Sequence, residues 1–430
     1  MWIQMSRETK DSGIEWIGEI PEDWEVVKLG IVADISTGNT LKDPDNIKYS
    51  KSEGIDWLKT NNLLGVDGVS NSSLKIKEQY ISEARLTNPR SVLVTCIGDI
   101  GKLGYTSKPV AFNQQINSIT FTKDIIYWKY GMYALYSQRE QQESFANGNV
   151  LKILNRENQK KVVITVPKDI NKQIKISNTL DKICLYIRKL VDKTQLSIKE
   201  LKKYKQSLIT ESVTKGLDPN VEMKDSGIKW IDNIPKHWDI RSIGNYYLQV
   251  KDKNLLSQEE NLLSLSYGKI VKRNYHSADG LLPANFNNYI IVEPNDIVLR
   301  MTDLQNDHKS LRTGFVNESG IITSAYITLR PRKNQEFISK FIQLFLHSFD
   351  IYKGFYGMGS GVRQNVTFND IKKIKIILPP IIEQKQIIRY LENKVSTIDN
   401  LIENKIKVIE ELENYKKSLI YEYVTGKKEV

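Results

Sequence analysis

The sequence has little of what a metal centre or a disulfide framework requires. Its 430 residues include 2 cysteines and 4 histidines. Cys96 and Cys184 lie far apart and in expected elements of different type, so neither a disulfide nor a cysteine-based zinc site is expected. The histidines are scattered without ligand spacing, at His237, His276, His308 and His347. The sequence therefore predicts no metal bound by this chain.

Long hydrophobic runs are also absent. No stretch of about eighteen apolar residues occurs, which excludes a membrane-spanning helix of ordinary length. The N-terminus lacks the charged and then apolar pattern of a signal peptide. We therefore expect a soluble, cytoplasmic protein without a membrane partner.

Motifs of enzyme chemistry are missing as well. Gly98–Lys102 lacks the glycine spacing of a phosphate-binding loop and is typical of a turn. The Pro379–Pro380 pair follows Leu378 and precedes Ile381, so it does not form the Asn/Asp-Pro-Pro-aromatic motif of amino-methyltransferases. Acidic residues are plentiful, but no pattern selects a nuclease site among them. The sequence predicts no catalytic residue.

Positive charge, in contrast, is in excess. Lysine and arginine number 62 against 51 aspartates and glutamates, a formal net charge of +11. Such a chain is attracted to a polyanion such as nucleic acid. A chain of this length is also too long for one small core and suits two or more domains.

One long stretch occurs twice. Residues 171–213 return as residues 381–424, and the match is tightest where Tyr204–Ile209 aligns with Tyr415–Ile420. Neither copy contains an internal glycine or proline, and apolar residues recur three and four apart. This pattern predicts two long helices that need a partner to cover one apolar stripe. The obvious partner is the other copy, and we expect an antiparallel coiled coil that acts as a spacer.

The expected seam of this coiled coil contains fourteen mainly apolar positions. They are Leu180, Ile183, Ile187, Leu190, Leu201, Tyr204 and Leu208 in the first copy and Leu391, Ile398, Leu401, Val408, Leu412, Tyr415 and Leu419 in the second.

A second repeat precedes each globular region. Lys10–Ile17 recurs as Lys224–Ile231, and both copies continue through Ile-Pro to a tryptophan, Trp24 or Trp238. We call these two stretches the lead segments. Glycine and proline mark them as turns carrying aromatic anchors. We expect the tryptophans to pack the segments against a neighbouring element.

The regions between the repeats share an order of elements but not their residues. Strands are expected at 91–97, 116–121 and 161–166 in the first half and at 296–299 and 326–329 in the second. Helices are expected at 123–147 and 337–349, followed by turns at 147–149 and 357–361. The pattern predicts an α+β chain with a pseudo-twofold internal repeat. Its expected parts are a first globular domain at 1–168, a helix at 169–216, a second globular domain at 217–380 and a helix at 381–430.

Together these features resemble the specificity subunits of type I restriction-modification systems, the HsdS family. The resemblance is carried by both lead segments, by the Gly359–Arg363 turn that leads through Pro379–Pro380 to Glu383-Gln384, and by the terminal Tyr-Lys-x-Ser-Leu-Ile helices. It implies two target-recognition domains, each reading one half of a bipartite DNA sequence, with the helices setting the gap. The first half matches less well, since Gly148-Asn149-Val150 stands where the second half has Gly361-Val362-Arg363.

The resemblance also implies partners and cofactors. Two methyltransferase (M) subunits using S-adenosylmethionine would dock on this chain, and restriction (R) subunits would add cleavage driven by ATP with Mg²⁺. The chain itself would be noncatalytic and would bind double-stranded DNA without a cofactor of its own.

Residues that could contact DNA lie in loops of the two domains. Arginine suits guanine, asparagine and glutamine suit adenine, and lysine suits phosphate. The candidates are Lys59, Thr60, Asn61, Asn62, Lys102, Asn113, Gln114 and Gln115 in the first domain and Tyr267, Lys269, Lys272, Arg273, Arg300, Arg312 and Arg363 in the second.

Two other functions remain open from the sequence. The chain could be an enzyme with a cryptic nuclease or methyltransferase site, which activity of the purified chain would favour. It could also be a coiled-coil adaptor that does not bind DNA, against which the net charge and the two dissimilar domains argue.

Overall fold

The computed structural model of the chain describes residues 8–43, 47–255, 257–273, 285–307, 309–333, 337–358 and 366–430. The chain divides into two compact units, one of residues up to Gln195 together with residues 406–430, and the other of residues 196–405. Each unit holds a globular head and one part of each of two long helices, α5 (Ile170–Lys215) and α8 (Ile381–Val424). Within the described ranges, no helix combines the length and apolar character that crossing a bilayer requires.

The head of the first unit is built on an antiparallel sheet of four strands in the order β4-β11-β8-β9. These strands are β4 (Ala33–Thr37), β8 (Ser91–Thr95), β9 (Leu103–Thr106) and β11 (Ile116–Phe121). A second sheet, β10-β6-β7-β5, consists of β5 (Tyr49–Ser50), β6 (Ile55–Leu58), β7 (Lys75–Ile76) and β10 (Ala111–Phe112). Short helices complete the head: α1 (Leu29–Val32), α2 (Trp128–Ser137), α3 (Arg139–Ser144) and α4 (Arg156–Gln159), with 3₁₀ turns at Thr60–Asn62, Gly65–Asp67 and Glu78–Glu83.

The head of the second unit repeats the order of the main sheet as β16-β23-β20-β21. Its strands are β16 (Tyr247–Gln249), β20 (Ile297–Leu299), β21 (Thr313–Phe315) and β23 (Ile327–Pro331). Two further strand pairs are β17 (Leu263–Ser266) with β18 (Lys269–Lys272) and β19 (Ile290–Val292) with β22 (Gly320–Ile322). The helices are α6 (Ser339–Ile351) and α7 (Phe368–Ile371), with 3₁₀ turns at Ile243–Asn245 and Gly354–Gly357.

Each lead segment forms a hairpin followed by a strand that pairs with the strand before a long helix. The hairpins are β1 (Thr9–Asp11) with β2 (Glu19–Pro21) and β13 (Met223–Ile228) with β14 (Ile231–Pro235). The later pairs are β3 (Trp24–Lys28) with β12 (Val163–Pro167) and β15 (Asp239–Ser242) with β24 (Lys375–Leu378). Trp24 and Trp238 are buried, as expected, whereas Trp16 is half exposed.

The structure confirms an α+β chain with an internal repeat and corrects the extent of one element. The predicted strands at 91–97 and 116–121 are β8 and β11, and the predicted helix at 337–349 is α6. The helix expected at 123–147 is instead two helices, α2 and α3. Gln138 separates them because its backbone (φ −102°, ψ 27°) is not helical.

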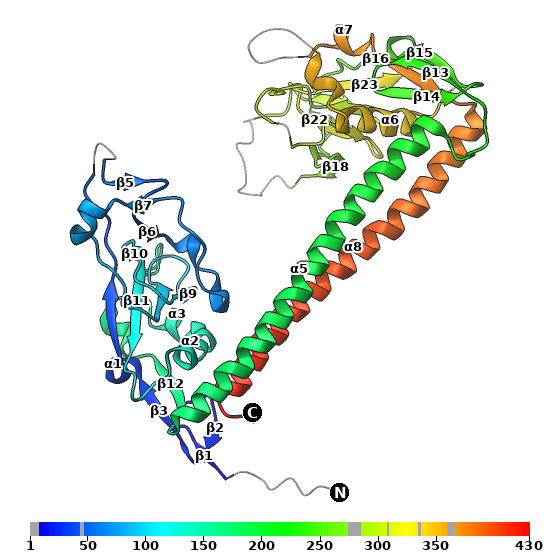
Figure 1. Cartoon of the computed structure of the whole chain (residues 1–430). Helices are drawn as coiled ribbons and strands as arrows, with labels where there is room; N and C mark the ends of the chain where they lie inside the picture. Colours follow the sequence, from blue (N-terminus) through cyan, green and yellow to red (C-terminus); the bar gives the residue numbers. More distant parts are fainter. Residues whose placement is uncertain are drawn as a thin grey trace, which may run out of the picture. The chain divides into compact units, whose positions relative to one another are not determined.

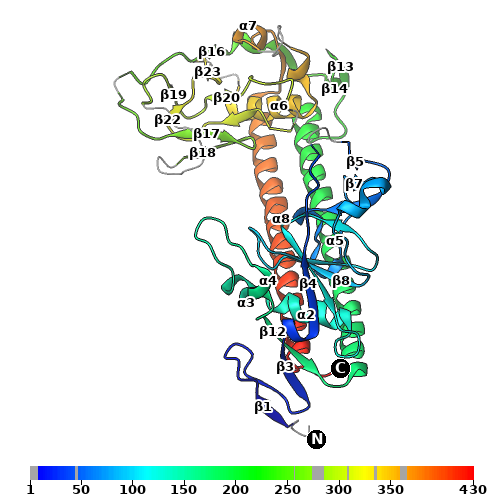
Figure 2. The same ribbon diagram turned by 90° about the vertical axis from the view of Figure 1, so that its left-hand side faces the viewer.

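Within each unit the two long helices pack in opposite directions. In the first unit, the early part of α5 and the end of α8 share one apolar cluster, which contains Leu180, Cys184, Leu419 and Tyr423. In the second unit, the end of α5 shares a cluster with the start of α8. The helices lie side by side in two perpendicular views (Figures 1 and 2). Burial of these stripes supplies the helix pair with the apolar contact that each helix lacks alone.

The apolar stripe differs from the predicted seam at every second position. Tyr204, Leu401, Val408 and Tyr415 were expected in the seam but are 44–56% exposed. Ile183 and Leu190 are half-buried, and the remaining predicted positions, Leu180, Ile187, Leu201, Leu208, Leu391, Ile398, Leu412 and Leu419, are buried or half-buried. At every second position, the stripe contains the residue that directly follows the predicted one. These residues are Cys184, Val191, Ile198 and Lys205 in α5 and Val395, Ile402, Ile409 and Lys416 in α8.

The sequence alone does not decide between the predicted seam and the observed stripe. Apolar residues lie on both sides of the positions that the seam and the stripe have in common. Leu401 and Ile402 are adjacent, and consecutive residues point about 100° apart around a helix, so only one of them can face the partner. Lys205 and Lys416 enter the stripe because their aliphatic stems cover apolar surface while their amines pair with Asp399 and Glu413.

Candidate nucleic-acid interface

Two of the predicted DNA-contacting loops lie together in the first unit. Lys59–Asn62 directly follows β6, and Asn113–Gln115 directly follows β10. These strands pair in parallel, with Phe112 opposite Leu58, and the Asn113 amide N donates to the Leu58 carbonyl at 3.0 Å. Since neighbouring parallel strands end at the same edge, both loops leave the sheet at one place.

Two buried asparagines brace these loops. The Asn62 carboxamide accepts from the Lys59 amide N at 2.9 Å and donates to the Asn71 carbonyl at 3.2 Å. The Asn113 carboxamide donates to the Gln115 Oε1 at 3.0 Å and accepts from the Gln115 amide N at 3.2 Å. Both side chains are less than 10% exposed. These internal hydrogen bonds and the burial argue against base contacts by Asn62 and Asn113, whose contact with DNA stays a prediction.

A third loop reaches the same edge. The Cys96 amide N donates to the Gln115 carbonyl at 2.8 Å, and the Lys102 amide N donates to Thr95 Oγ1 at 3.0 Å. The β8–β9 loop that carries Lys102 thus lies against Asn113–Gln115. The structure brings together six of the predicted polar side chains, which we call the first surface: Lys59, Thr60, Asn61, Lys102, Gln114 and Gln115. Lys59, Asn61 and Gln114 are exposed, and the other three are half-buried.

Packing fixes two of the exposed side chains of the first surface. The Lys59 amine lies 5.0 Å from the centroid of the Trp57 ring, a cation–π distance. Gln114 Oε1 accepts a hydrogen bond from the Thr40 hydroxyl. With the half-buried Lys102, the first surface offers two cations, Lys59 and Lys102, and several amides.

In the second unit, the β17–β18 hairpin presents a tyrosine at its turn. Tyr267 is 89% exposed, with φ at 45°, and Gly268 follows with φ at 78°. Two consecutive residues of positive φ are typical of the tight hairpin turn that matches strand twist. Lys269 and Lys272 are exposed on β18, and the Lys272 amine lies 2.8 Å from Glu318 Oε2.

The two predicted arginines of the β20–β21 loop have different roles. Arg312 is fully buried, and its guanidinium donates hydrogen bonds to loop carbonyls. The use of its donors inside the protein argues against the predicted contact of Arg312 with DNA, which stays a prediction. Arg300 is one-third exposed, and its Nη2 lies 3.6 Å from Asp307 Oδ2. Arg363 lies outside the described residues.

Arg300 opens onto a hollow of about 530 Å³ beside the β17–β18 hairpin. The hollow is lined by two arginines, several hydroxyl groups and a few apolar side chains: Ser264, Leu265, Ser266, Val271, Arg273, Arg300, Thr302, Thr323, Ala325 and Tyr326. Hydrogen bonds from Ser310 lower the pKa of Asp307 to about 2, so its carboxylate stays charged beside Arg300 at neutral pH. We call the hollow and the hairpin residues Tyr267, Lys269 and Lys272 the second surface.

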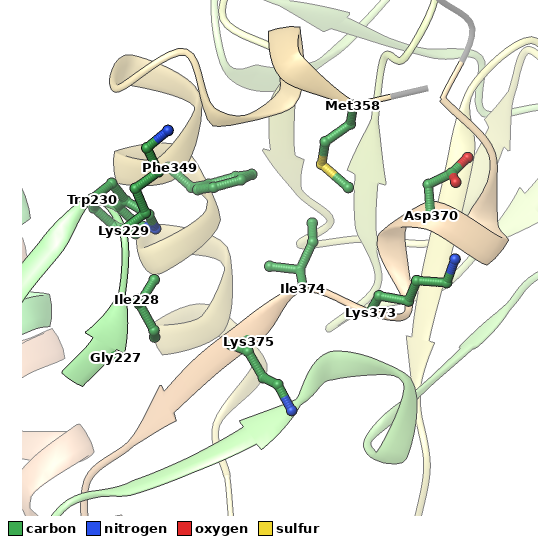
Figure 3. A pocket seen from close by; sticks show the side chains of 10 residues that line it. All are labelled: Gly227, Ile228, Lys229, Trp230, Phe349, Met358, Asp370, Lys373, Ile374 and Lys375. Carbon is green, nitrogen blue, oxygen red and sulfur yellow. The ribbon is translucent and has the colours of Figure 1, made fainter. Parts of the chain in front are cut away.

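A different hollow, of about 430 Å³, lies between the second lead segment and α6 (Figure 3). Phe349 and Met358 point into it, and Lys373 and Lys375 lie at its rim (Figure 3). Trp230 packs against the rings of Phe345 and Tyr352, each with a centroid distance of 5.3 Å. The aromatic side chains beside this hollow are thus part of the packing that holds the lead segment to α6.

In the part of the chain that the structure describes, no three His, Cys, Asp or Glu side chains gather in a way that could hold a metal ion. Burial raises the pKa of the Cys96 and Cys184 thiols to about 11, so both are protonated at neutral pH and poor nucleophiles.

Comparison with known proteins identifies the family. The profile of the type I restriction modification DNA specificity domain matches residues 21–203 and again residues 235–411. The chain belongs to this family. The two matches each begin within a lead segment and end within a long helix, so the family's domain is the repeated unit itself.

Two related proteins agree with this assignment. The chain is 28% identical, over 96% of both chains, to a protein of Methanocaldococcus jannaschii named as the specificity subunit of type I restriction enzyme MjaX. It is 25% identical over 57% of its length to the MjaIX specificity subunit of the same organism.

Solved structures show the same fold at low sequence identity. One is a chain from a structure concerned with complex assembly and conformational transition of the type I R-M system (TM-score 0.70, 14% identity, 95% of this chain and 99% of that chain). Another is the HsdS subunit of Thermoanaerobacter tengcongensis (TM-score 0.50, 15% identity, 95% and 98%).

The hydroxyl groups that line the second surface were not predicted from the sequence. Ser264 and Ser266 alternate with buried Leu263 and Leu265 along β17, a pattern that signals one polar face of a strand. Thr323 and Tyr326 come from a distant segment, and no local pattern joins them to β17.

Proposed function

We propose that this chain is the DNA-recognition and scaffold subunit of a type I restriction-modification complex, each head reading one half of a bipartite target. The observation that carries the proposal is that equivalent loops differ in chemistry. Lys102 closes the loop from β8 to β9, and Arg300 opens the loop from β20 to β21. Both loops join the last two strands of sheets with the same order. One scaffold therefore presents different hydrogen-bonding groups at the same place in its two copies.

The two surfaces suit the two parts of DNA binding. Lys59, Lys269 and Lys272 are exposed cations that would contact phosphates and give binding that weakens steeply with salt. Asn61, Gln114 and Arg300 offer the paired hydrogen bonds that distinguish bases in the major groove. Because the amides lie on the first surface and the arginine on the second, the two half-sites would be unrelated in sequence.

The chain would be noncatalytic and would act in the cytoplasm with partner subunits. Two methyltransferase subunits would supply S-adenosylmethionine chemistry, and restriction subunits would supply ATP and Mg²⁺. Support comes from the two-copy architecture, which offers equivalent lead segments and helix ends for two copies of one partner. The long helices would set the gap between the half-sites.

The test is to co-express the chain with its methyltransferase subunit and map methylated adenines across the host genome by long-read sequencing. A bipartite motif with two unrelated halves and a fixed gap is expected. A single undivided motif, or no methylation, would contradict the proposal. Nuclease or methyltransferase activity in the purified chain alone would instead favour an enzyme.

A further inference from the structure

A single buried cation organises residues 300–307 of the second unit. The Arg312 guanidinium makes five hydrogen bonds: Nε to the Tyr356 hydroxyl (3.1 Å), Nη1 to the carbonyls of Arg300 (3.1 Å) and Thr302 (2.8 Å), and Nη2 to the carbonyls of Asp303 (3.3 Å) and Asp307 (2.5 Å). A guanidinium has five N–H donors, so all of them are used. The loop is thereby fixed around one side chain that is 0% exposed.

This clamp also fixes the start of the loop, where Arg300 stands. The Arg300 amide N donates to the Arg312 carbonyl at 2.9 Å, and the Arg300 carbonyl accepts from Arg312 Nη1. Both backbone groups of Arg300 are therefore held by Arg312. The Arg300 side chain is held near Asp307, whose own carbonyl is in the clamp. Because its backbone and side chain are already held in place, Arg300 would lose little conformational freedom on binding a base.

The lining of the hollow in front of Arg300 complements the polar edge of a nucleotide base and does not suit an apolar ligand. Two arginines and the hydroxyl-bearing residues Ser264, Ser266, Thr302 and Thr323 line it, and among the described residues its lining includes no acidic side chain. A guanidinium offers two parallel N–H groups that match O6 and N7 of guanine. Hydroxyl groups can accept from or donate to the neighbouring base or phosphate.

We propose that Arg300 is the residue through which the second unit selects guanine in its half of the target, with Arg312 as a positioning residue behind it. The inference rests on the proposed DNA-recognition function and adds to it a residue, a base and a direction of change. It predicts that the half-site read by the second unit contains a guanine whose recognition depends on Arg300.

The test replaces Arg300 in the complex with its methyltransferase subunit. Arg300→Gln removes the fork for guanine and offers one that suits adenine, so preference for guanine should fall roughly tenfold to a hundredfold at one position of one half-site. The other half-site and the gap should not change. Methylation of duplexes carrying each base at each position of the wild-type motif measures this. Arg241→Gln, which removes an exposed arginine elsewhere in the same unit, is the matched control and should leave the motif intact.

The outcomes separate this inference from the proposed function. A bipartite wild-type motif that Arg300→Gln leaves unchanged, or weakens equally at all positions, would overturn the role of Arg300. No bipartite motif from the wild-type chain would overturn the proposed function itself, and the inference with it.

The role of Arg312 needs a milder variant, because lysine at this position would bury a cation with fewer donors and could prevent folding. Tyr356→Phe removes the hydroxyl that accepts from Arg312 Nε and donates to the Asp307 carbonyl at 2.9 Å. We expect a smaller loss of preference at the same guanine and at no other position. A lower melting temperature with full guanine preference would show that the clamp is structural only.

Discussion

At the scale of single residues, Asp350 links the arginine clamp to pH. Its Oδ2 accepts from the Arg312 amide N at 2.6 Å, and its Oδ1 is buried and has no hydrogen-bond partner among the residues that the structure describes. Burial raises the pKa of Asp350 to about 6, although Arg312 and Lys353 favour the charged form. The folded state thus binds this proton more tightly than the unfolded chain does. The resulting stability is fully present below about pH 4 and is lost as the pH rises through about 6.

Asp350→Asn should remove this dependence. Between pH 4 and 7, the wild-type chain should lose on the order of 2–3 kcal/mol of unfolding free energy relative to the variant, whose amide does not titrate. Thermal unfolding of both chains across this range measures the difference. Asp232→Asn, at an exposed position of the same unit, is the control. Parallel stability curves for wild type and Asp350→Asn would refute the link.

At the scale of elements, the register of the long helices can be tested with two adjacent residues. Ile402 is 8% exposed and lies in the core of the second unit, whereas Leu401 is 45% exposed. Ile402→Ala should cost about 2–4 kcal/mol, through lost burial and the cavity left behind. Leu401→Ala should cost about 0.5 kcal/mol or less. Denaturant unfolding that shows the opposite order would restore the seam predicted from the sequence.

The same element shows how far the sequence could lead. Repetition of residues 171–213 as 381–424, with apolar spacing of three and four, was enough to predict two long helices that pack in opposite directions. It could not choose between Leu401 and Ile402, since both spacings place an apolar residue in the stripe. The choice depends on which side of the shared positions the partner helix covers, which is a tertiary property.

Loop residues were less predictable for a related reason. Asn62, Asn113 and Arg312 have the same side-chain chemistry as residues that read bases, and each lies in a loop next to a strand. The structure uses their side-chain oxygens to accept from loop amides and their N–H groups to donate within the loops. Residue type therefore proposed the loops, whose contact with DNA stays a prediction, and burial decides which side chains of each loop reach the surface.

At the scale of the whole molecule, the helices provide a test of how the gap is set. Inserting seven residues near Thr194 and seven near Lys405 adds one heptad to each helix and preserves the stripe. Each helix lengthens by roughly 10 Å at 1.5 Å per residue, about three base pairs of DNA. We expect the mapped motif to keep both half-sites and to gain about three base pairs of gap. An unchanged gap would contradict the spacer role, and an insertion of only two residues in one helix, which breaks the stripe, should abolish methylation.

The first unit is built from two separate stretches of the chain, and this affects the order in which the two units fold during translation. The Val424 carbonyl accepts hydrogen bonds from the Tyr130 hydroxyl, at 3.1 Å, and from Thr165 Oγ1, and Leu419 and Tyr423 complete the same core. The second unit, in contrast, is one continuous stretch of chain. During translation the head of the first unit must wait for residues 419–424, which are synthesised after the whole second unit, so the second unit completes its core earlier. Nascent chains arrested before Leu412 leaves the ribosome should resist protease in the second head and be cleaved in the first, and the finished chain should resist in both.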